Sequence, residues 1–95
     1  MAAYVIANID VTDADAYQEY RARVGATIAA HGGRFVCRGG AVEVMEGDYD
    51  PHRVVVVEFP DMATLKRWYA SPEYTPLIAL RQRASKGSLY VVEGV

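Results

Sequence analysis

The 95-residue sequence contains one cysteine and two histidines, and its lysines and arginines are scattered rather than clustered. The lone Cys37 excludes an intrachain disulfide and a site built from several thiolates, and it favours a reducing compartment. Scattered basic residues and a net charge of −2 predict no nucleic-acid partner. The first residues lack the basic stretch and apolar core expected of a secretory leader, and no apolar run approaches the roughly 20 residues that cross a bilayer. We therefore expect a cytoplasmic protein with no membrane partner.

Catalytic signatures are absent as well. The sequence has no nucleophile elbow, no P-loop and no dinucleotide-binding glycine pattern. Its two histidines, His31 and His52, are not at metal-ligand spacing. We expect no metal and no cofactor.

What is present is the composition of a folded domain. Hydrophobic residues make up 52% of the chain and charged residues 23%, which excludes disorder. The length suits a single domain over residues 1–95, near the lower limit for a self-sufficient core.

Hydrophobic periodicity in the first half predicts a strand, a helix and a second strand. Ala3–Val11 is apolar at nearly every position, which is typical of a central strand. A helix follows from near Asp13, capped by Thr12, and the Gly32-Gly33 pair ends it. Its buried stripe comprises Tyr17, Tyr20, Val24 and Ile28. The next strand, Arg34–Arg38, is interrupted by Gly39-Gly40 and is expected to resume over Ala41–Glu46.

The second half repeats this order. A polar connection, Gly47–His52, leads to a strongly apolar strand, Arg53–Phe59, and Pro60-Asp61 marks the start of a helix from about Met62 to Ala70. Ser71-Pro72 and Thr75-Pro76 predict two successive helix starts, with the last helix ending near Ser85. Ser88–Glu93 is the final strand.

The order β-α-β-β-α-β predicts a ferredoxin-like α+β sandwich with a four-stranded antiparallel sheet. We expect the two most apolar strands, the first and the third, to lie side by side and parallel in its centre. Two helices cover only one face of such a sheet, yet both faces of these strands are largely apolar. The sequence therefore predicts a homodimer that packs sheet against sheet.

Several polar and aromatic residues stand on elements that are otherwise apolar, and these are the candidate site residues. They are Asn8, Tyr17, His31, Arg38, Glu58, Trp68, Tyr69, Tyr74 and Arg81.

Glu58 and His31 are the candidates for catalysis. Glu58 ends a run of four valines, so its carboxylate is expected either to pair with Arg38 or to act as a general base or ligand anchor, with Arg38 or Arg81 holding an anionic group. His31 has a side chain that titrates near neutrality, but its place at a helix end also suits a partner of the helix dipole.

The aromatic residues have two interpretations. Tyr17 belongs to the helical stripe and fits the core better than a pocket. Trp68, Tyr69 and Tyr74 surround the Ser71-Pro72 break, which is expected to place Trp68 and Tyr74 on either side of a recess.

Several blocks in this order resemble the family called domain of unknown function 1330. They are HGGRFVCRGG (31–40), VVVVEFP (54–60), WYASPEY (68–74) and the terminal VVEG. The resemblance implies a ferredoxin-like fold of the dimeric α/β-barrel superfamily but no particular activity. Relatives elsewhere in that superfamily include small cofactor-free monooxygenases with a pocket between helices and sheet, and this likeness concerns the fold alone.

Two hypotheses of function follow. The first is a homodimer with one small-molecule pocket per subunit, walled by Trp68, Tyr69 and Tyr74 and polarised by Arg38, Glu58 and His31. An enzyme of this kind would perform cofactor-free, monooxygenase-like or isomerase-like chemistry on a small anionic or aromatic compound. The second is a non-catalytic binding or interaction module with a packed aromatic core. A cavity touching Trp68 and Glu58 favours the first, and a solid core with Glu58 paired to arginine favours the second.

Overall fold

The computed structural model describes all 95 residues, and its elements confirm the predicted order. In chain order they are β1 (Ala3–Val11), α1 (Ala14–Ala30), β2 (Arg34–Arg38), β3 (Arg53–Phe59), α2 (Met62–Tyr69), α3 (Thr75–Ala84) and β4 (Ser85–Glu93). None of the three helices combines the length and hydrophobicity that a membrane crossing demands.

The four strands form one antiparallel sheet in the order β2-β3-β1-β4, so the ferredoxin-like fold is confirmed. β1 and β3 are its central strands, as expected, but the expectation that they run parallel is wrong. The reason is the connectivity. β1 and β2 run in the same direction because α1 carries the chain back between them, and β3 inserts between them antiparallel to both.

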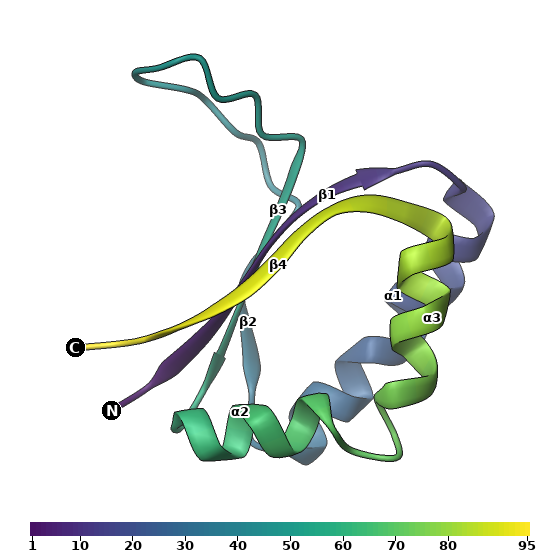
Figure 1. Cartoon of the computed structure of the whole chain (residues 1–95), viewed down its shortest axis with the longest axis vertical. Helices are drawn as coiled ribbons and strands as arrows, with labels where there is room; N and C mark the ends of the chain where they lie inside the picture. The colour runs from purple at the N-terminus through teal and green to yellow at the C-terminus, as the bar shows by residue number, and fades with distance from the viewer.

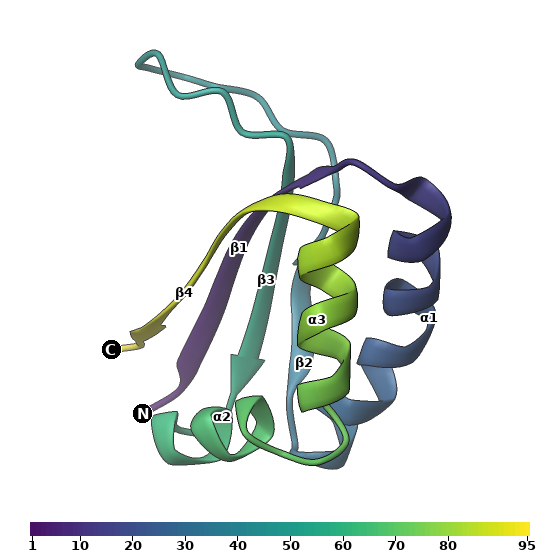
Figure 2. The same cartoon turned by 45° about the vertical axis from the view of Figure 1, so that its right-hand side comes forward.

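All three helices lie on one side of the sheet (Figures 1 and 2). We call the helix-covered side the inner face and the other side the outer face. In β1 the inner residues Ala3, Val5, Ala7 and Ile9 are buried, whereas the alternate residues of the strand remain partly exposed. The strict alternation follows from the pleat of a strand, which sends successive side chains to opposite faces.

The helix starts agree in part with the predicted caps. Asp13, not Thr12, caps α1 by accepting a hydrogen bond from Ala16 N, at 3.2 Å. Asp61 caps α2 as predicted, accepting from Thr64 N at 2.7 Å. The second cap predicted at Thr75 is wrong, because Thr75 is already helical and α3 has no side-chain cap. The Ser71 hydroxyl instead accepts from Tyr74 N at 3.2 Å within the turn that precedes α3.

Most of the connection between β2 and β3, from Gly40 to His52, extends away from the sheet as an arm (Figures 1 and 2). The strand expected over Ala41–Glu46 does not form within this chain. Its alternating valines suit a strand, but no other strand lies beside it to supply hydrogen bonds. Every residue from Gly40 to Asp50 is exposed.

β2 contains a bulge, and the side chains after it point to the opposite face of the sheet from the one that an unbroken strand would give them. Phe35 pairs with Val57, but Cys37 pairs with Val56 instead of Val55, so one extra residue is inserted between Phe35 and Cys37. A bulge of this kind re-aims the side chains that follow it. Arg38 consequently faces the helices opposite Val55, whereas an unbroken register would turn it to the outer face.

Gly33 lies where the end of α1 meets the sheet, and its packing gives a test of the fold. A methyl group there would lie 2.7 Å from Phe59 Cε1 and 2.8 Å from Ile28 Cγ2, both buried. We expect Gly33→Ala to lower the free energy of unfolding by about 1–3 kcal/mol, the cost of overpacking a core. Urea denaturation would measure it. Gly40→Ala, which meets no atom within 4 Å, is the control; equal stability of the two variants would contradict the described packing.

Candidate functional site

An apolar cavity lies between the inner face of the sheet and the helices α1 and α3. It encloses about 40 Å³ and is open to solvent on one side. Thirteen of its 17 lining residues are hydrophobic, and the other four are all arginines. The lining residues are Val5, Ala7, Ile9, Tyr17, Tyr20, Arg21, Val24, Ile28, Phe35, Arg38, Arg53, Val55, Val57, Trp68, Tyr74, Arg81 and Leu89.

Three arginines reach solvent and mark the open side, which we call the rim: Arg21, Arg38 and Arg53. Arg38 Nη2 donates to the backbone oxygen of Arg21 at 2.7 Å, and its guanidinium lies over the ring of Phe35, 4.1 Å from the centroid. The guanidinium of Arg53 lies 5.5 Å from the ring centroid of Tyr17. These contacts hold the arginines against the wall through ring faces and a carbonyl rather than through carboxylates.

The rim is electrostatically unbalanced. Burial lowers the pKa of Arg38, and repulsion from Arg21 and Arg53 lowers it further. Arg53 Nε is buried and has no hydrogen-bond partner, the only such side-chain atom in the structure. A buried donor without an acceptor is costly, so this atom is the point of the rim where an acceptor would be most favourable.

The inner end of the cavity carries a hydrogen-bonded group of two tyrosines and an arginine. Arg81 Nη1 donates to the Tyr74 hydroxyl at 2.7 Å, and that hydroxyl lies 2.9 Å from the hydroxyl of Tyr20. Burial raises the pKa of both tyrosines, so both stay protonated at neutral pH. They can donate hydrogen bonds there but cannot serve as bases.

Trp68 forms part of the wall and is fixed on both its polar and its apolar side. Its Nε1 donates to the hydroxyl of Thr27 at 3.0 Å. The centroid of its ring lies 4.0 Å from the ring centroid of Tyr74 and 5.2 Å from that of Phe59. The expectation that Trp68 and Tyr74 stand on opposite sides of a recess is therefore wrong, because the two rings pack against each other. Tyr69, the third aromatic candidate, is 36% exposed and does not line this cavity.

Glu58 lies on the outer face, away from the cavity. Its carboxylate pairs with Arg34 at 2.6 Å and accepts a hydrogen bond from the Tyr4 hydroxyl at 3.3 Å. The Arg38–Glu58 pair offered as one alternative is wrong, because Arg34 is the residue of β2 opposite Glu58, whereas Arg38 lies at the other end of β2 and faces the helices. Each hypothesis thus meets one part of its criterion. A cavity touches Trp68, as the small-molecule hypothesis requires, but Glu58 is paired to an arginine, as the hypothesis of a packed core requires.

His31 is likewise outside the cavity. It is the C-cap of α1, and its Nδ1 lies 3.0 Å from the backbone oxygen of Thr27. This is the helix-end position that the sequence offered as the alternative to a catalytic role.

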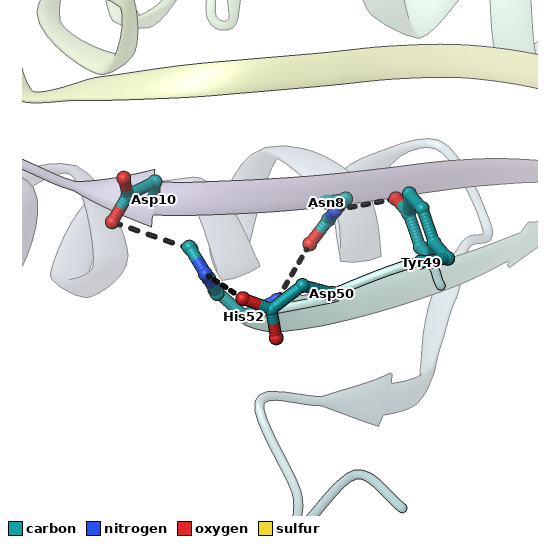
Figure 3. Close-up of polar contacts among 5 residues, drawn as sticks. All are labelled: Asn8, Asp10, Tyr49, Asp50 and His52. Carbon is teal, nitrogen blue, oxygen red and sulfur yellow. Dashed lines mark hydrogen bonds and ion pairs between the residues drawn. The ribbon is translucent and has the colours of Figure 1, made fainter. Parts of the chain in front are cut away.

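Asn8 is on the outer face and anchors the base of the arm (Figure 3). Its amide nitrogen donates to the Tyr49 hydroxyl, and its oxygen accepts from the backbone nitrogen of His52 at 3.1 Å. Beside it, the His52 ring lies 3.6 Å from Asp10 and 3.4 Å from Asp50 (Figure 3). The structure thus assigns Asn8 to holding the arm and not to the cavity.

Of the nine candidates, the structure brings Tyr17, Arg38, Trp68, Tyr74 and Arg81 together at one cavity and leaves four outside. The most informative residue that the sequence interpretation missed is Arg53. Its signal was the alternation of β3, which places it on the same side as Val55 and Val57.

The family model of the domain of unknown function DUF1330 matches residues 2–95. The chain belongs to the DUF1330 family. The resemblance seen in the sequence motifs is thereby confirmed, and it assigns no activity. A search of curated proteins returned no match.

Solved structures similar to this DUF1330 protein share its fold. A protein of unknown function from Rhodopseudomonas palustris matches with a TM-score of 0.79 at 19% identity, over 99% of this chain and 82% of the other. A dimeric ferredoxin-like protein of unknown function from Jannaschia sp. CCS1 gives 0.77 at 13%, over 99% and 100%. SnoaB, a cofactor-independent oxygenase from Streptomyces nogalater, gives 0.70 at 19%, over 99% and 93%.

The buried tyrosines make alkaline stability a test of the inner end of the cavity. Because their pKa values are raised, the folded chain above pH about 10 keeps protons that the unfolded chain has lost, so the free energy of unfolding falls as pH rises. Tyr74→Phe should weaken this fall. At neutral pH it should cost about 1–3 kcal/mol, because Arg81 loses its buried partner.

Urea denaturation between neutral and alkaline pH would measure both effects, and phenolate absorbance would follow ionisation. Tyr90→Phe, which removes only the hydroxyl of a tyrosine outside the cavity and keeps its ring on the outer face, is the matched control. Simultaneous titration of all seven tyrosines near their ordinary pKa in a chain that stays folded would contradict the network.

Proposed function

We propose that this DUF1330 protein binds a small organic molecule in the cavity between its helices and its sheet, one per subunit of a homodimer. The observation that carries the proposal is the composition of the cavity wall. It is apolar except for guanidinium and hydroxyl groups that converge from the rim and the inner end. Small-molecule sites combine an apolar wall with a few placed polar groups in this way.

The side chains of the cavity favour binding over acid-base catalysis. No Asp, Glu, His or Cys is among the lining residues, and the two tyrosine hydroxyls are held in their protonated form. The cavity therefore supplies cations and hydrogen-bond donors, but no base that titrates near neutrality. Glu58 and His31, the candidates for that task, are engaged elsewhere.

The volume of the cavity sets a condition on binding. About 40 Å³ holds roughly three water molecules. Sites for larger organic ligands enclose about 300–1,000 Å³. A ligand must therefore widen the open side, where the long side chains of Arg38 and Arg53 are the groups that can swing outward.

A fragment screen tests the pocket. Trp68 is the only tryptophan and lines the cavity, so its fluorescence reports on occupancy. We expect at least one organic fragment to change this emission and to raise the melting temperature, since a ligand of the folded state stabilises it. Val55→Phe, which fills the cavity, should abolish both effects, and Ala79→Phe on the exposed side of α3 should not. A diverse screen without a hit, or a hit that still binds Val55→Phe, would refute the pocket.

The outer face supports the homodimer. Tyr90 is 56% exposed and Val92 is 45% exposed there, beside Ile6 of β1. The arm adds the exposed side chains of Val42, Val44, Met45 and Tyr49. Apolar surface of this kind on a small domain is typical of an interface, and the Jannaschia neighbour is described as dimeric.

The exposed free thiol of Cys37 is consistent with our placing the protein in the cytoplasm.

Light scattering at micromolar concentration tests the dimer. We expect twice the monomer mass for the wild type. Tyr90→Glu should raise the dimer dissociation constant on the order of 100-fold, because an unpaired carboxylate would be buried between the sheets. Ala79→Glu on the helical side is the control and should remain dimeric. A monomeric wild type would exclude the homodimer.

A further inference from the structure

The positive charge of the cavity is the feature that restricts the class of ligand it can bind. Arg21, Arg38, Arg53 and Arg81 all line it, and no acidic residue does, although the whole chain carries a net charge of −2. None of the four takes part in an ion pair. Four guanidinium groups at one cavity without a carboxylate leave a strong local preference for an anion.

The rim also contains a hydrogen-bond donor that has no acceptor. Arg53 Nε is buried without an acceptor, and the rest of the guanidinium packs on Gly39, where any side chain would collide with it. Arg38 is held nearby by the carbonyl of Arg21 and the ring of Phe35. The two arginines are thus placed by the backbone, by glycine and by aromatic rings, and not by an acidic partner.

The walls exclude a purely inorganic anion as the best ligand. Beyond the rim the cavity is bounded by aromatic and aliphatic side chains, including Tyr17, Trp68 and Tyr74. Such walls stabilise a flat apolar body through buried area and ring contacts, which phosphate or sulfate does not offer.

Resting on the proposed function, we propose that the ligand is an aromatic carboxylate, with its carboxylate held by Arg38 and Arg53 and its ring directed into the cavity. One carboxylate oxygen accepts from Arg53 Nε, which removes the unsatisfied donor. A carboxylate between the rim arginines also offsets the burial and the repulsion from Arg21 and Arg53 that lower the pKa of Arg38. This gain offsets the cost of moving the arginine side chains off the rings of Phe35 and Tyr17.

Three probes separate the parts of this proposal: benzoate, its neutral analogue benzamide, and inorganic phosphate. Binding to the protein is followed by Trp68 fluorescence and by calorimetry. We expect benzoate to bind about tenfold or more tightly than benzamide, as charge-assisted hydrogen bonds require. We expect phosphate to compete weakly, and added salt to weaken benzoate more than benzamide.

Two variants locate the carboxylate. Arg38→Gln and Arg53→Gln should each weaken benzoate about tenfold and leave benzamide nearly unchanged. Arg83→Gln, an exposed arginine of α3 outside the cavity, is the matched control and should bind as the wild type. Melting temperatures confirm that the variants fold, and the salt dependence of the wild type tests the charge without any substitution.

Equal binding of benzoate and benzamide, or unchanged discrimination in both glutamine variants, would overturn the anion while leaving the pocket intact. Phosphate that competes as well as benzoate would overturn the aromatic body. Failure of both benzoate and benzamide while other fragments bind at Trp68 would overturn the ligand class alone. An empty fragment screen, or fragments that still bind Val55→Phe, would overturn the proposed pocket itself.

Discussion

All helices of this protein lie on one face of a four-stranded sheet, and the rest of the structure depends on that constraint. The inner face of β1 carries Ala3, Val5, Ala7 and Ile9, all buried under the helices. The opposite side of the same sheet keeps large apolar groups in water, which a partner surface would remove. Because Ala7 is small and the rim arginines are long, the covered face also retains a partly open cavity rather than closing completely.

A single inserted residue in β2 decides the chemistry of that cavity. In a regular register, Arg38 would lie on the outer face, the side on which Glu58 pairs with Arg34. The bulge turns Arg38 to the inner face, where it meets Arg53 and Arg21 but no carboxylate. One change in strand register thus moves Arg38 from the outer face to the inner face and completes an unbalanced cationic rim there, while the Arg34–Glu58 ion pair stays on the outer face.

The sequence predicted those features that depend on local periodicity. Nearly continuous apolar runs identified β1 and β3, the stripe of Tyr17, Tyr20 and Val24 identified the buried side of α1, and Asp61 marked a helix start. It failed where tertiary context decides. The bulge has no signature in the letters between Arg34 and Arg38, so the sequence assigned no face to Arg38, and the Arg38–Glu58 pair that it offered as one alternative does not form. The strand expected over Ala41–Glu46 has the right alternation, but a strand needs a neighbour, and this chain provides none.

The arginines at the two ends of the cavity have different surroundings. This difference relates the stability of the folded chain to the binding of a ligand. At the inner end, Arg81 is 8% exposed and is stabilised by the Tyr74 hydroxyl, which is itself bonded to Tyr20. At the rim, solvent supports part of the charge, but Arg53 Nε is cut off from it. An anion at the rim would supply the missing acceptor without disturbing the tyrosine group. Without a ligand, the burial of Arg53 Nε costs free energy that no hydrogen bond offsets. The atom that lowers the stability of the free protein is therefore also the one that would favour an anionic ligand.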